Sequence, residues 1–178
     1  MLVKITAVLA VVVVAILAFA ATKPDSFRVE RKLVIQAAPD KVFPYLEDPK
    51  KTIEWSPWEK KDPNLKKTFS GAAKGKGAVY EWDGNNDIGA GRLEITEVVP
   101  NAKVVMDLHF LRPMEGRNIA MYVVTPKDGG SEVAWSIEGP SPFLSKVMCV
   151  FMNMDKMIGG EFDKGLADLK VLVEGKGA

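Results

Sequence analysis

The feature that most constrains the fold is a succession of six short segments of alternating polarity within residues 65–138, separated from one another by turn-forming residues. The predicted strands cover residues 66–70, 77–82, 91–99, 103–111, 118–125 and 132–138. An earlier strand is indicated at residues 27–35, where apolar and polar side chains also alternate. Connections this short leave no room for the crossover helices that parallel strands require. The sequence therefore predicts a seven-stranded antiparallel sheet.

Helical patterns occur on both sides of this series of strands. Pro39 is typical of a helix start and indicates a short helix after the first strand, and residues 50–55 favour a second one. In residues 142–174, apolar side chains recur at steps of three and four, which predicts one long amphipathic helix. Gly159 and Gly160 in its middle indicate either a bend or a group that approaches the backbone closely. We expect an α+β fold in which a curved sheet wraps around this long helix.

Residues 5–21 carry no charge and are long enough to form a single membrane-spanning helix. This divides the chain into an N-terminal anchor, residues 1–21, and a domain at residues 22–178. Residues 18–20 (Ala-Phe-Ala) also fit the pattern before a signal-peptide cleavage site, so a cleaved signal is the alternative. Lys4 and the amino terminus favour a cytoplasmic start, although the basic residues after the segment favour the opposite orientation. We expect the domain to lie outside the cytoplasm, and to be periplasmic or secreted if the segment is removed.

Charge and rare residues exclude several classes of function. A net charge of +1 gives no basic stripe for nucleic acid. With a single histidine, His109, and a single cysteine, Cys149, the chain has too few ligands for a Cys/His metal site, and it cannot form a disulfide within itself. We expect neither a metal nor a cofactor. The sequence leaves the oligomeric state open.

Two indoles flank a proline in the segment Trp55-Ser56-Pro57-Trp58. Because proline fixes its own φ and restricts the preceding residue, the chain must turn there. Rings of this size either close the end of a core or line the mouth of a cavity. The side chains that would line such a cavity are Trp55, Trp58, Tyr80, Trp82, Met106, Leu108, Phe110, Trp135, Phe151, Met152 and Phe162. The same side chains could instead fill the interior completely.

A few polar side chains could add chemistry to the interior. Asp155 lies near the apolar stripe of the long helix, where an unpaired carboxylate would be costly and its pKa would rise. Arg31 shares the inward parity of its strand and is the natural partner. Both could also lie at the margin and reach water. Tyr80 and Tyr122 are the other candidates for proton transfer.

Several local strings, at residues 35–43, 54–59, 139–143 and 154–162, resemble the SRPBCC (START-like) superfamily. The order of the predicted elements is also that of its helix-grip fold. In detail, the strings look like the polyketide cyclase/dehydrase branch of bacteria, and the last one looks like membrane-anchored members. The resemblance spans residues 27–173.

The resemblance implies a domain near the membrane that binds, and could transport, a hydrophobic small molecule or lipid in an internal cavity. The first alternative is a cyclase/dehydrase-like enzyme in which Tyr80, Tyr122, Arg31 or Asp155 transfers protons. That enzyme would need a polar group deep in the cavity, whereas simple binding needs polar groups only at the mouth. The second alternative is a protein-interaction module with a filled core that acts through the loops around Trp55 and Trp58.

Overall fold

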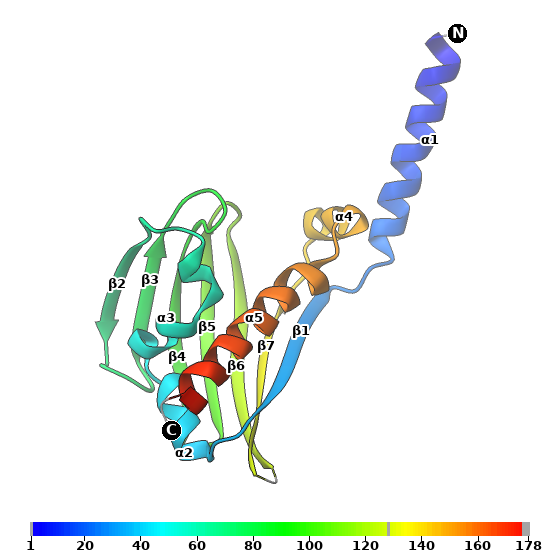
Figure 1. Ribbon diagram of the computed structural model, residues 1–178. Coiled ribbons are helices and arrows are strands. Elements are labelled where there is room, and N and C mark those ends of the chain that lie inside the picture. Colours follow the sequence, from blue (N-terminus) through cyan, green and yellow to red (C-terminus); the bar gives the residue numbers. More distant parts are fainter. Residues whose placement is uncertain (1, 128, 176–178) are drawn as a thin grey trace.

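In a computed structural model of the chain, residues 2–127 and 129–175 are described; residues 1, 128 and 176–178, which include the end of the predicted domain, lie outside them. Over this range the chain forms one seven-stranded antiparallel sheet in the order β1-β7-β6-β5-β4-β3-β2 (Figure 1). The strands are β1 (Ser26–Ile35), β2 (Lys66–Gly71), β3 (Ala78–Asp83), β4 (Ala90–Val99), β5 (Lys103–Arg112), β6 (Gly116–Lys127) and β7 (Gly130–Pro140). The predicted antiparallel sheet is confirmed, and the fold is an α+β helix grip.

Short turns join consecutive strands from β2 to β7, while β1 pairs with the last strand. Val29 lies opposite Ile137, and Leu33 lies opposite Val133, so the apolar parity of the two strands matches. Gly71 ends β2 with a φ of +72°, and a Cβ there would lie 2.1 Å from the carbonyl oxygen of Gly77. Only glycine can make this turn without strain. The pairing of β1 with β7 places the first and last strands side by side in one sheet.

Short helices follow β1, as predicted, and cover one part of the concave face. They are α2 (Pro39–Val42), η1 (Phe43–Tyr45), α3 (Pro49–Trp55) and η2 (Pro57–Lys60). Asp48 caps α3 by accepting a hydrogen bond from the Lys50 backbone N–H at 2.9 Å. Ser56 adopts an extended conformation before Pro57, which ends α3 and produces the predicted turn.

The single helix predicted over residues 142–174 is wrong in one respect, because it is two helices. α4 (Phe143–Phe151) ends where Met152 becomes extended, and α5 (Met154–Gly175) begins two residues later. The side chain of Asn153 accepts a hydrogen bond from the Lys156 N–H at 2.9 Å, so it caps the new helix. α5 is the long helix of the grip and crosses the concave face of the sheet (Figure 1). α4 does not cross the sheet; it lies beside the end of α1 (Figure 1).

α5 continues through Gly159 and Gly160. A Cβ on Gly159 would lie 2.1 Å from a guanidinium nitrogen of Arg31, whereas one on Gly160 would meet no described atom within 4 Å. Of the two predicted causes of the glycine pair, the close approach of another group therefore applies at Gly159. The group is the side chain of Arg31 on β1.

The N-terminal helix α1 (Leu2–Ala21) extends away from the sheet (Figure 1). Its segment Lys4–Ala21 has a mean hydropathy of 2.6 and is, among the described helices, long and apolar enough to cross a membrane. Most of its side chains are exposed, but Ala20 in its last turn is fully buried. The end of α1 lies against α4.

Candidate functional site

A cavity of about 320 Å³ lies between the concave face of the sheet, the short helices and α5. Eight of the predicted residues line it: Trp58, Tyr80, Trp82, Met106, Leu108, Phe110, Trp135 and Phe162. Aliphatic residues complete the wall, among them Leu93 and Ile95 of β4, Ile137 of β7 and Ile158 of α5. Its volume lies near the lower end of the range of about 300–1,000 Å³ that is usual for small-molecule sites.

Trp55 lies outside this wall and is part of the core. It is fully buried, and its indole Nε1–H donates a hydrogen bond to the Tyr45 carbonyl oxygen at 3.0 Å. Its ring meets Tyr122 and Trp135 edge-on, with centroids 5.7 and 5.3 Å apart. Of the two indoles at the turn, Trp55 closes the core, and Trp58 contributes to the cavity.

Phe151 and Met152 also lie outside the cavity, contrary to the sequence-based prediction. Their exposed fractions are 71% and 39%. The reason is the break at Met152, because the helical phase that would turn both side chains inward ends before α5 begins. The residue that α5 does place in the wall, beside Phe162, is Ile158.

The cavity wall contains a polar cluster built on Glu59. The hydroxyl of Tyr80 donates a hydrogen bond to the Glu59 carboxylate at 2.5 Å, and Lys67 forms an ion pair with the same carboxylate. Burial raises the pKa of Tyr80 well above its usual range, and the hydrogen bond to Glu59 raises it further. Tyr80 therefore stays protonated. Sequence reasoning missed Glu59, although it directly follows the Trp-Ser-Pro-Trp turn.

Tyr122 also lines the cavity and is almost completely buried. Burial alone raises the pKa of its hydroxyl above the usual range. This hydroxyl forms no hydrogen bond with the described residues, so it offers the cavity an unused donor.

Arg31 and Asp155 pair as predicted, but they do so outside the cavity. Two guanidinium nitrogens of Arg31 donate to the two carboxylate oxygens of Asp155 at 3.0 and 2.8 Å, and its Nε lies 3.3 Å from Asp163. The Asp155 side chain is 60% exposed. Its hydrogen bond with Arg31 lowers its pKa, which is opposite to the expected rise. The pair joins β1 to the start of α5 and has no access to the cavity.

His109 lies on the outer face of β5, between cavity residues on either side in sequence, and its Nε2 is 3.2 Å from Glu115. Over the described part of the chain, no group of three or more His, Cys, Asp or Glu side chains is placed to hold a metal ion.

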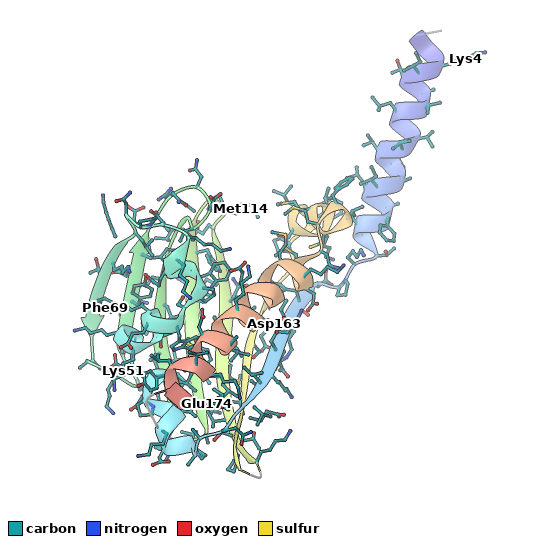
Figure 2. All side chains as sticks on the ribbon, in the orientation of Figure 1. Lys4, Lys51, Phe69, Met114, Asp163 and Glu174 are labelled. Atoms are coloured by element: carbon teal, nitrogen blue, oxygen red, sulfur yellow. The ribbon has the colours of Figure 1, made fainter. Side chains whose placement is uncertain are left out.

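The mouth of the cavity can be located from the exposure of its lining residues. Asp87, Arg112 and Pro113 are the exposed members of the described wall. Asp87 belongs to the β3–β4 connection, Arg112 ends β5 and Pro113 begins the β5–β6 connection, all at the end of the sheet where α1 and α4 lie. Met114, next to Pro113, marks this end in Figure 2. The cavity therefore opens toward the same end of the molecule as the N-terminal helix.

A sheet that grips a long helix around an apolar cavity defines the class of helix-grip, SRPBCC-type proteins. Within it, the chain belongs to the family described as polyketide cyclase/dehydrase and lipid transport, which it matches over residues 26–174. No curated protein is significantly similar to the chain in sequence.

Solved structures share this fold at low sequence identity. Protein CV1439 from Chromobacterium violaceum is 18% identical, with a TM-score of 0.59 over 85% of this chain and 99% of that one. The di-domain aromatase/cyclase StfQ of the steffimycin biosynthetic pathway is 15% identical, with a TM-score of 0.63 over 85% of this chain and 52% of that one. The Aha1 dimer from Colwellia psychrerythraea is 16% identical, with a TM-score of 0.57 over 83% of this chain and 96% of that one.

Proposed function

We propose that this protein binds a hydrophobic small molecule or lipid in the cavity under α5. The observation that carries the proposal is an apolar cavity of about 320 Å³ with a mouth at one end of the sheet. Burying apolar ligand surface contributes about 25 cal/mol per Å², so affinity requires no covalent chemistry. The family's association with lipid transport and polyketide chemistry supports the same class of ligand.

The polar groups of the wall suggest what kind of ligand fits. The free Tyr122 hydroxyl can donate to a carbonyl oxygen, while the Tyr80 oxygen and Glu59 can accept from a hydroxyl. The Tyr122 hydroxyl would otherwise face an apolar surface without compensation. We therefore favour an apolar molecule that carries one or two carbonyl or hydroxyl groups, rather than a pure hydrocarbon.

The N-terminal helix supports a location next to a lipid bilayer. We propose that residues 5–21 anchor the protein as a single span and that the domain lies outside the cytoplasm; a cleaved signal would place it in the periplasm or medium. An anchor would hold the domain beside the membrane in which hydrophobic ligands dissolve.

A cyclase/dehydrase-like enzyme is the second candidate, and the Glu59–Tyr80 cluster inside the cavity favours it. General acid–base catalysis is most effective when the pKa of the catalytic group lies near the working pH. Because burial moves the pKa values of Tyr80 and Tyr122 away from neutrality, we rank binding first. The open cavity counts against an interaction module with a filled core.

The test is to identify what co-purifies with the full chain. We would purify wild type and Ala120→Phe, which fills the cavity from β6, and would analyse the released compounds by native mass spectrometry and solvent extraction. Ile119→Phe is the matched control, because Ile119 is adjacent in sequence and exposed on the opposite face of the strand. We expect a hydrophobic compound with wild type and Ile119→Phe but not with Ala120→Phe. If all three proteins carry the same compounds, these compounds adhere to α1 and not to the cavity.

A further inference from the structure

The helix α4 is amphipathic, but its apolar face is exposed and its charged residue is buried, the reverse of a helix on the surface of a soluble protein. Its side chains Phe143, Leu144, Met148 and Phe151 are exposed, by 51%, 63%, 38% and 71%. At successive steps of one, four and three residues, they share one face of the helix. Its only charged residue, Lys146, is buried, with an exposed fraction of 8%. In water a helix of this composition would bury the aromatic face and expose the lysine.

The buried lysine is held in place by an ion pair. Lys146 Nζ lies 2.5 Å from the carboxylate of Asp25, in the segment between α1 and β1. Its contact with Lys146 lowers the pKa of Asp25. The ion pair favours the rotation of α4 that keeps the apolar face outward. The outward orientation is therefore specified by the sequence.

The surroundings of this apolar face indicate what covers it. The last turn of α1 lies against α4, so the exposed face continues the apolar surface of a helix that is long enough to cross a membrane (Figure 1). Two further methionines are exposed beyond the break: Met152, next to Phe151 in sequence, by 39%, and Met157, in the first turn of α5, by 50%. Lys156 between them is exposed and can reach anionic headgroups.

We propose that α4 and the first turn of α5 form a membrane-contact surface that lies in the interface of the bilayer crossed by α1. Interfacial helices place Phe, Leu and Met side chains below the headgroups and keep charges above them. Because the cavity mouth opens at the same end of the molecule, this contact brings the mouth close to the lipid surface. The surface rests on the proposed anchor role of α1, and its use as a ligand route rests on the proposed binding function.

The test measures the depth of single residues in a bilayer. The full chain with Cys149→Ser would carry an environment-sensitive fluorophore at Phe151→Cys or, in a second protein, at Phe143→Cys. Val171→Cys is the matched control, since Val171 is apolar and 73% exposed but lies toward the far end of α5. Each protein is reconstituted in phosphatidylcholine/phosphatidylglycerol vesicles with or without a doxyl quencher on the lipid acyl chains.

We expect the labels at positions 151 and 143 to shift to shorter emission wavelength and to lose most of their fluorescence with the quencher, while the label at 171 changes little. If the labels on α4 are quenched no more than the label at 171, the proposed membrane contact is wrong. It is also wrong if they shift to shorter wavelength without quenching, which would indicate that α4 packs against protein, such as a second copy of the chain. The measurement needs no bound ligand. Failure here together with a compound retained by wild type and lost in Ala120→Phe would overturn the surface and leave the binding function standing.

Discussion

Arg31 connects β1 to α5 through several hydrogen bonds of its guanidinium. Besides Asp155 and Asp163, its guanidinium donates to the backbone carbonyls of Glu30 and Asp155. Because Arg31 lies outside the cavity, these contacts serve the packing of α5 on β1 and not chemistry. Exposed pairs of this kind contribute modestly to stability and are sensitive to pH.

We predict that Asp155→Asn lowers the melting temperature slightly at pH 7 and has no effect in acid. Arg31 lowers the pKa of Asp155 in the folded state, so the ionised carboxylate stabilises the fold. This stabilisation is fully present above the unfolded pKa of about 4 and is lost as the pH falls through the lower folded pKa. Melting curves of the full chain from pH 7 to about 2.5, followed by tryptophan fluorescence, should converge at the acidic end. Asp87→Asn, on an exposed loop, is the control. A difference between wild type and Asp155→Asn that persists in acid would contradict the role of the ion pair.

The sequence placed the cavity residues of the strands more reliably than those around the Trp-Ser-Pro-Trp turn. Strand parity correctly turned Tyr80, Trp82, Leu108 and Phe110 inward, because side chains alternate strictly along a strand. The division between Trp55 and Trp58 depends on the Tyr45 carbonyl that accepts from the Trp55 indole, and this contact is formed only by the tertiary fold. Glu59 was missed because a carboxylate beside a turn usually reaches water.

At the scale of elements, the two neighbouring glycines of α5 have different surroundings. Gly159 is buried against the Arg31 guanidinium, whereas Gly160 faces open space among the described residues. In a helix interior alanine is more favourable than glycine by about 1 kcal/mol. The same substitution should therefore have opposite effects at adjacent positions.

We predict that Gly160→Ala raises the melting temperature by about 2–4 °C, as expected for about 1 kcal/mol in a chain of this size. Gly159→Ala should lower it, because the new Cβ would displace Arg31 from Asp155. In an Arg31→Ala background Gly159→Ala should become stabilising, since the obstructing group is gone. Melting of these three variants, of wild type and of Arg31→Ala would show this reversal. If Gly159→Ala is destabilising in both backgrounds, the proposed conflict with Arg31 is wrong.

The strands could be placed from the sequence because turn formers separate them, but the break between α4 and α5 could not. The apolar stripe continues across the break, and a stripe does not reveal whether its partner is a sheet or something else. Asn153 is the local signal for the new helix start. It is followed by residues that are compatible with one continuous helix, so only the tertiary arrangement decides.

At the scale of the whole molecule, the cavity reduces the stability that this amount of apolar sequence could provide. A filled interior would gain the dispersion contacts that the cavity walls now lack. The unbound Tyr122 hydroxyl adds a second cost, because it faces the cavity without a partner among the described residues. Such costs are common where a fold maintains a binding site.

We therefore predict that Ala120→Phe, freed of lipid, is more stable to unfolding than ligand-free wild type by about 1 kcal/mol. In a chain of this size, that gain raises the melting temperature by about 2–4 °C. The new ring enters the cavity between Met106 and Ile137, the residues paired with Ala120 on the adjacent strands. Ile119→Phe should not share this gain, because it adds the same ring to the exposed face. Bound ligand should reverse the order, since a ligand that binds only the native state stabilises wild type by an amount that grows with the logarithm of its concentration above Kd, and it cannot stabilise the filled variant. Destabilisation by Ala120→Phe without ligand would mean that the walls close on themselves when empty, and the binding site would then form only around its ligand.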